Sequence, residues 1–134
     1  MLSVEELNRH LGELDFDVPH MVVEHAASDY VVSRSAIEGL RLRPGGYVPG
    51  PVLMALADLT GWLLVFTRAG FTPMALTWDL KINFLRPAHG ADLIVTGRQT
   101  KFGRLCHATV EIALDGDLER FVAHATTTYV LPAD

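Results

Sequence analysis

Asp58 is the only acidic residue in an otherwise apolar stretch that runs from Val52 to Ala69. An ionised carboxylate among apolar side chains is costly unless it is paired or hydrogen-bonded, so Asp58 needs either a structural partner or a role toward a ligand. As a reactive group, an ionised carboxylate acts as a nucleophile or as the base that activates water. The structural alternative is a local polar interaction, for example with Thr60 or with another chain.

A second candidate group lies just ahead of this stretch. Gly50 sits between Pro49 and Pro51, in a cluster of turn-forming residues that begins at Arg43, and proline suits the first turn of a helix. The start of a helix presents free N–H groups and a favourable dipole to developing negative charge. The sequence therefore offers a backbone donor at Gly50 and a carboxylate at Asp58.

The elements that must position these groups follow from the pattern of apolar residues. A buried helix is expected over residues 51–69, because nearly every residue there is apolar and Gly70 stands where a helix would end. The Ser-x-x-Glu spacing at Ser3 predicts a shorter amphipathic helix within residues 1–15, on the outside of the domain. Residues 21–37, rich in Val, Ser and Tyr, predict a long first strand or a hairpin.

Residues 74–131 predict an antiparallel meander of four strands. The strand after Pro73 alternates with period two, which places Trp78 on an apolar face and Thr77 on the opposite, polar face. A buried helix followed by strands is typical of an α+β domain in which the helix lies against one face of the sheet. We therefore expect a single α+β domain over residues 1–134.

Composition excludes several classes of function. The 134 residues are 49% hydrophobic and 20% charged, as expected for one domain with its own core. The net charge of −5 is spread along the chain, which argues against a nucleic-acid partner or an anionic membrane surface, and the apolar run from Val52 to Phe66 is too short to span a membrane. A single cysteine, Cys106, and a start without a signal segment indicate a cytoplasmic protein. The histidines lack the spacing of a zinc site, so no metal is expected.

Two stretches resemble the hotdog-fold thioesterases of the PaaI-like, 4-hydroxybenzoyl-CoA thioesterase type. Residues 50–58, Gly-Pro-Val-Leu-Met-Ala-Leu-Ala-Asp, are similar to that family's His-Gly-Gly-x-x-x-x-Leu-x-Asp motif, and residues 77–88 are similar to its strand ending in a Pro-Ala turn. The resemblance covers roughly residues 43–131 and implies a hotdog fold, a curved antiparallel sheet around one long central helix. It also implies an acyl-CoA thioesterase that needs no cofactor beyond the coenzyme A of its substrate.

The resemblance implies a role for each of three residues. Asp58 becomes the catalytic carboxylate, the Gly50 N–H polarises the thioester carbonyl, and the Thr77 hydroxyl lies near the carboxylate. Asp58 follows Gly50 by eight residues, which is roughly 12 Å along a helix axis, so one helix cannot place both groups around one carbonyl. If both act there, they come from different subunits, and the protein is expected to be a homodimer or homotetramer with composite sites, as in the family.

The coenzyme A of the substrate brings phosphates that need cations or N–H groups. Candidates lie at strand ends, where family members hold the nucleotide, and in the loop ahead of the helix: Arg43, Arg86, Lys101 and Arg104. Trp62 and Trp78 are candidates for the acyl pocket, with plain core packing as the alternative.

Two other functions are compatible with a hotdog domain. The family's loop His and second Gly are replaced by Pro49 and Pro51, which favours a domain that binds an acyl-CoA or another apolar ligand without turnover. A hydroxyacyl thioester dehydratase is disfavoured, because no His occurs between His25 and His89 and because Ala55 stands at the position of that enzyme's helix acid. For a thioesterase, Asp58 as nucleophile and Asp58 as general base are both compatible with the sequence, and we favour the general base.

Overall fold

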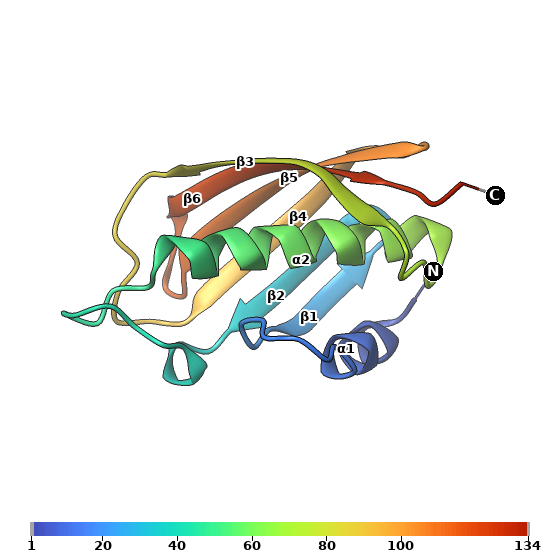
Figure 1. The fold of residues 1–134 in the computed structure, drawn as a ribbon. Coiled ribbons are helices and arrows are strands. Elements are labelled where there is room, and N and C mark those ends of the chain that lie inside the picture. The colour runs from blue at the N-terminus through green and yellow to red at the C-terminus, as the bar shows by residue number, and fades with distance from the viewer. Residues whose placement is uncertain (1, 134) are drawn as a thin grey trace.

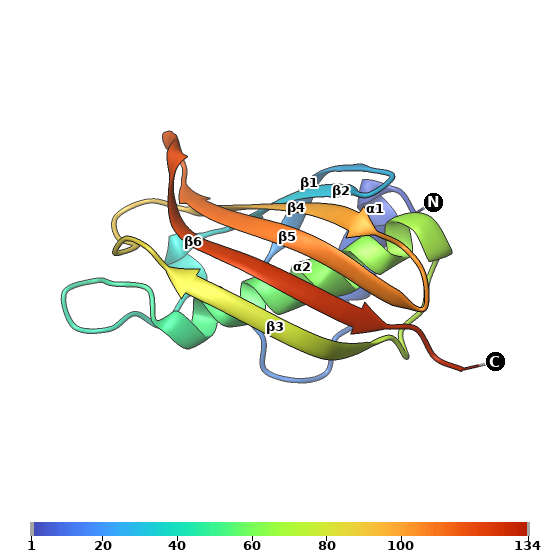
Figure 2. The same cartoon turned by 90° about the horizontal axis from the view of Figure 1, so that it is seen from above.

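Six antiparallel strands curl around the long helix α2 (Gly50–Ala69) in the computed structural model, which describes residues 2–133 (Figure 1). The strands follow the order β1-β2-β4-β5-β6-β3 across one sheet, and α2 lies in its concave face (Figures 1 and 2). The strands are β1 Val22–Ala27, β2 Tyr30–Ser35, β3 Leu76–Phe84, β4 Leu93–Lys101, β5 Leu105–Leu114 and β6 Asp117–Val130. The expected α+β architecture, with one central helix wrapped by a curved sheet, is confirmed.

The short helix α1 (Val4–Gly12) lies on the outside, beside the first hairpin (Figure 1). Ser3 Oγ accepts a hydrogen bond from the Glu6 N–H, and the Glu6 carboxylate accepts one from the Ser3 N–H, so the expected capping box is confirmed. The Asn8 amide donates to Val23 O at 3.0 Å and accepts from the Val23 N–H at 2.7 Å. Because Val23 lies in the edge strand β1, Asn8 takes the place of a neighbouring strand there.

Helix α2 begins at Gly50 and ends at Ala69. Gly70 follows with a φ of 80°, a conformation that glycine adopts readily, and its N–H donates to Phe66 O at 3.1 Å. The helix has 20 residues and its most apolar 18-residue window has a mean hydropathy of 1.5, so by length and composition alone α2 could span a membrane, in contrast to the expectation from the shorter run Val52 to Phe66. However, 61% of its most apolar window is buried within the protein, so α2 is the helix at the centre of the core.

The strand order corrects the expected four-stranded meander of residues 74–131. Only β4, β5 and β6 form a meander, whereas β3 pairs with β6, and β4 pairs with β2. The connection between Phe84 and Leu93 is too long for a tight hairpin and carries the chain from an edge strand to the middle of the sheet (Figure 2). Alternating side chains indicate a strand but not its neighbours.

A short 3-10 turn, η1 (Ile37–Gly39), follows β2.

Strand β3 forms the second edge of the sheet, and a bulge interrupts its alternation. The register with β6 shifts by one residue between Thr77 and Asp79. The shift places Thr77 on the inner face, toward α2, together with Leu80 and not with Asp79. The expectation that Thr77 shares the polar outer face is therefore wrong, because strict period two holds only in a strand without a bulge.

Candidate active site

Three elements meet at Asp58, in the middle of α2. Thr77 Oγ1, at the start of β3, donates to Asp58 Oδ1 at 2.7 Å, and the Tyr129 hydroxyl, near the end of β6, lies 2.9 Å from the same oxygen. The Tyr129 hydroxyl also lies 3.0 Å from the Asp58 backbone O, so these two acceptors share its single proton. Both hydroxyls hold Oδ1, and no group within residues 2–133 donates to Oδ2.

The bulge in β3 is what brings the two hydroxyls together. Thr77 and Tyr129 are cross-strand partners, and Leu80 pairs with Thr127 farther along the same face. Because Thr77 and Leu80 are three residues apart, a regular strand would place them on opposite faces. The extra residue between them allows the strand to contribute Thr77 to the site and Leu80 to the core.

Gly61, one helical turn after Asp58, lets β6 come close to α2. A Cβ at this position would lie 2.7 Å from Thr127 Cγ2 and 3.0 Å from Tyr129 Cε1, closer than carbon atoms normally pack. The missing side chain therefore sets the short separation at which the Tyr129 hydroxyl reaches the carboxylate.

The protonation of Tyr129 follows from its surroundings. Burial raises the pKa of the Tyr129 phenol well above its usual range, and the neighbouring Asp58 carboxylate acts in the same direction. The phenol therefore stays protonated at neutral pH and acts as a donor. Asp58 itself is only half-buried, and its partners among the described residues are neutral hydroxyls.

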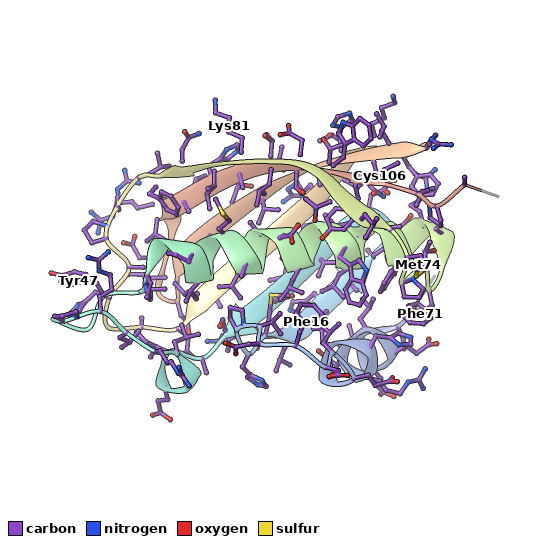
Figure 3. The ribbon with its side chains drawn as sticks, in the orientation of Figure 1. Phe16, Tyr47, Phe71, Met74, Lys81 and Cys106 are labelled. Carbon is purple, nitrogen blue, oxygen red and sulfur yellow. The ribbon has the colours of Figure 1, made fainter. Side chains whose placement is uncertain are left out.

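Asp58 lines a pocket of about 720 Å³ between α2, α1 and the start of β3. Most of the lining is apolar or aromatic, and the volume lies within the usual range of small-molecule sites. Figure 3 shows Phe16 below α2 and Phe71 beside the end of the helix, and both residues line the pocket. Trp62 also lines it and packs edge-on against Phe66 at 4.6 Å.

Trp78, the second aromatic candidate, lies elsewhere. It occupies the bulge of β3, is 66% exposed, and does not line the Asp58 pocket in the single described chain. The structure thus places Trp62 in the pocket and leaves Trp78 on the surface at the edge of the sheet.

Gly50 lies in a different pocket, of about 610 Å³, at the start of α2. Pro51 has no N–H, and the N–H groups of Val52 and Leu53 both donate to Pro49 O. The Gly50 N–H has no acceptor within residues 2–133, so it is the donor left available in the first helical turn. One chain therefore does not bring Gly50 and Asp58 together.

The four candidate cations fall into two pairs. Arg43 and Arg86 line the pocket at the start of α2. Lys101 ends β4 and Arg104 precedes β5, so both lie at the opposite end of the sheet, toward the end of α2 (Figure 2). All four side chains belong to exposed residues, and one chain does not gather them into a single cluster.

Sequence reasoning missed Tyr129 and Gly61, although each leaves a signal. Alternation in β6 places Tyr129 on the core face with Thr127, and a buried tyrosine hydroxyl usually needs a partner. A glycine inside an apolar helix costs stability relative to alanine, which indicates that another element packs closely against it.

Comparisons with known proteins agree with the fold. The family model of the thioesterase superfamily matches residues 45–117, more than half of the chain. No curated protein sequence matches the chain.

Several solved structures share the fold over nearly the whole chain. A proposed thioesterase from Silicibacter sp. TM1040 is 29% identical, covers 99% of this chain and 94% of its own, and has a TM-score of 0.88. A hypothetical thioesterase from Streptococcus pneumoniae TIGR4, solved with coenzyme A, is 22% identical over 87% of this chain and 89% of its own, with a TM-score of 0.73. A mutant of the phenylacetic acid degradation protein PaaI from Thermus thermophilus is 24% identical over 85% of this chain and 95% of its own, with a TM-score of 0.71.

Proposed function

The chain belongs to the thioesterase superfamily, and we propose that it hydrolyses acyl-CoA thioesters with Asp58 as the general base. The observation that carries this proposal is the hydrogen bonding of Asp58. Two hydroxyls hold Oδ1, while Oδ2 has no protein donor within residues 2–133 and the side chain lines a pocket. A carboxylate held by one oxygen is oriented and keeps the other oxygen free to take a proton from water.

In the proposed reaction, Asp58 takes a proton from a water molecule as the water oxygen attacks the thioester carbonyl carbon. The carbonyl oxygen becomes an oxyanion, which accepts a hydrogen bond from the N–H of Gly50 of the partner subunit. When the tetrahedral intermediate collapses, the C–S bond breaks and the proton on Asp58 passes to the departing sulfur. The products are a carboxylic acid and the free thiol of coenzyme A.

A composite site is required because the two groups are far apart in one chain. Asp58 and Gly50 line separate pockets, and they are roughly 12 Å apart along the axis of α2. Two helices related by a twofold axis and running in opposite directions would place Gly50 of one copy beside Asp58 of the other. The smallest active unit in this proposal is a homodimer.

The surface around β3 fits such a pairing. An unpaired edge strand with exposed apolar side chains is a site where another chain can add. The exposed apolar side chains on β3, beside it and on the neighbouring face of α2 are Met54, Met74, Leu76, Trp78, Phe84 and Leu85. A twofold axis through this surface would present the same patch of both copies to each other.

The two pockets suggest how the substrate lies in the dimer. The coenzyme A in the Streptococcus pneumoniae neighbour supports coenzyme A as the carrier. Arg43 and Arg86, next to Gly50, are the nearest cations for its phosphates, with Lys101 and Arg104 as the alternative pair. The acyl group would occupy the apolar pocket beside Asp58 and Trp62. This mechanism uses no metal and no cofactor.

Thiol release from a panel of short, medium and aryl acyl-CoA thioesters tests the proposal. We expect the parent protein to hydrolyse at least one substrate and the Asp58→Asn variant to be at least about a hundredfold slower, a loss of roughly 2.7 kcal/mol of transition-state stabilisation. Asp79→Asn is the matched control, because it makes the same chemical change on the exposed outer face of β3.

Two results would contradict the proposal. Equal activity of the Asp58→Asn and Asp79→Asn variants would remove Asp58 from the chemical step. No thiol release by the parent, together with tight binding of the same thioesters, would favour the second candidate function, a domain that binds acyl-CoA without turnover. The observation that favours this second function is the loop before α2, where Pro49 and Pro51 replace the family's loop His and second Gly.

A further inference from the structure

Three aromatic rings pack together beside the Asp58 pocket, near the end of α2. The His10 ring stacks on the Phe71 ring with centroids 3.8 Å apart and planes at 7°, and it meets Phe66 edge-on at 6.3 Å. Phe66 and Phe71 also contact each other edge-to-face at 5.3 Å. His10 and Phe71 line the pocket, whereas Phe66 is fully buried and supports them from the core.

These rings are fixed by two elements. His10 lies on α1, its side chain is 10% exposed, and its Nδ1 lies 3.6 Å from Glu13 Oε1. Phe71 follows Gly70, the residue that closes the last turn of α2, and Figure 3 shows Phe71 at that end of the helix. The stacked pair therefore joins α1 to the loop after α2, with the His10 side chain largely buried and Phe71 50% exposed.

The three rings lie at a definite distance from the reacting group. Phe66 follows Asp58 by eight residues, which is roughly 12 Å along the helix axis. Trp62 lies between them, one turn from each, and lines the same pocket. An acyl group whose carbonyl sits at Asp58 would extend past Trp62 and meet the rings.

We propose that His10 and Phe71 form the end wall of the acyl site and set the longest acyl group that the protein accepts. The proposal rests on the thioesterase function for the position of the reacting carbonyl. Glu13 and Asp17 also line the pocket, and no Lys or Arg does among the described residues, so an acyl group with a terminal carboxylate is disfavoured. The substrate class is a CoA thioester of an uncharged, apolar acyl group.

Binding and hydrolysis measured side by side test the wall. Non-hydrolysable S-alkyl-CoA thioethers with butyl, octyl, dodecyl and hexadecyl chains are titrated by calorimetry, and the matching acyl-CoA thioesters are assayed for thiol release. In Phe71→Ala the wall loses its ring, so the hexadecyl-to-octyl affinity ratio is expected to rise at least about tenfold. Phe71→Trp adds bulk and is expected to shift the preference toward shorter chains.

Phe121→Ala is the matched control, because it removes the same ring from a pocket on the outer face of the sheet. Equal hexadecyl-to-octyl affinity ratios in the parent, Phe71→Ala and Phe121→Ala would contradict the proposed end wall. If thermal melting shows that Phe71→Ala does not fold, the hexadecyl-to-octyl affinity ratio is measured in His10→Ala, which removes the other ring of the stacked pair. A raised hexadecyl-to-octyl affinity ratio in Phe71→Ala, with no hydrolysis by the parent, would refute the thioesterase function and keep the end wall. Hydrolysis by the parent with an unchanged affinity ratio in Phe71→Ala would do the reverse.

Discussion

The two pockets along α2 differ in what they offer a substrate. The pocket at Asp58 is mainly apolar and aromatic, its charged lining residues are carboxylates, and it has no Lys or Arg among its described lining residues. The pocket at Gly50 contains Arg43, Arg86 and an unused N–H, and none of its described lining residues is a carboxylate. Cleavage of a thioester on a phosphate-bearing carrier needs both sets of groups. This difference agrees with the proposed composite site, in which the Asp58 pocket of one chain and the Gly50 pocket of its partner act on the same substrate.

The two edges of the sheet also differ, in how far the chain itself covers them. At β1, the Asn8 side chain pairs with the backbone of Val23, so the chain itself covers part of that edge. At β3, apolar side chains such as Leu76 and Trp78 are exposed instead. A chain that protects one edge and leaves the other apolar is suited to pairing through the second edge.

The largest effect is expected at the Gly50 half-site. Gly50→Pro removes the N–H, whereas Gly50→Ala keeps it, and both add a Cβ at a position 3.3 Å from Phe84 Cζ. Proline fits the first helical residue, since Pro49 before it is extended. We expect kcat of Gly50→Pro to fall about 100- to 1000-fold below that of Gly50→Ala, the usual loss for one oxyanion donor. Equal kcat values for the two variants would exclude the Gly50 N–H as that donor.

A mixture of two inactive chains tests whether the half-sites come from different subunits. In a heterodimer of Asp58→Asn and Gly50→Pro chains, one composite site carries both defects and the other carries neither. Random pairing is therefore expected to restore about a quarter of the parent activity, measured after the chains are unfolded and refolded together. Each variant refolded alone serves as the control. If both half-sites belonged to one chain, the mixture would stay as inactive as its components.

A smaller effect is expected from the hydroxyls that hold Asp58. Tyr129→Phe and Thr77→Val each remove one hydrogen bond to Oδ1 and keep most of the side-chain volume. We expect each to lower kcat about tenfold with little change in KM, because one hydrogen bond to a charged group contributes about 1.5 kcal/mol. Thr126→Val is the control, since Thr126 is exposed on the outer face of β6. A rise in KM at constant kcat would mean that the hydroxyls bind substrate and do not orient the base.

The elements of the fold could be predicted from local patterns. The apolar run with its flanking Pro51 and Gly70 predicts α2, and the spacing at Ser3 predicts the cap of α1, because both depend on residues a few positions apart. The place of β3 beside β6 could not be predicted in this way. Strand pairing depends on long connections and on which face the helix covers, and neither is encoded within a short window.

The candidate site shows the same division. Asp58 stands out because a carboxylate in an apolar helix is expensive, and Gly50 because it precedes a helix. Tyr129 reaches Asp58 only through the bulge in β3 and the close approach at Gly61, two features that alternation alone does not indicate. The sequence therefore indicates the chemically unusual groups, Asp58 and Gly50. The structure adds Tyr129 and Gly61, whose contribution depends on which strand packs against α2.

The smallest effect is expected from the cations of the Gly50 half-site. Arg43→Ala and Arg86→Ala each remove an exposed charge from that pocket, and we expect roughly a fivefold rise in KM for acyl-CoA with kcat unchanged. The matching acyl-pantetheine, which lacks the nucleotide phosphates, should show no rise, so the ratio of the two KM values isolates the phosphate contact. Lys101→Ala and Arg104→Ala measure the same ratio at the opposite end of the sheet. If only these two variants raise the ratio, the phosphates lie at the far end of the sheet, and the Gly50 pocket supplies the oxyanion donor alone.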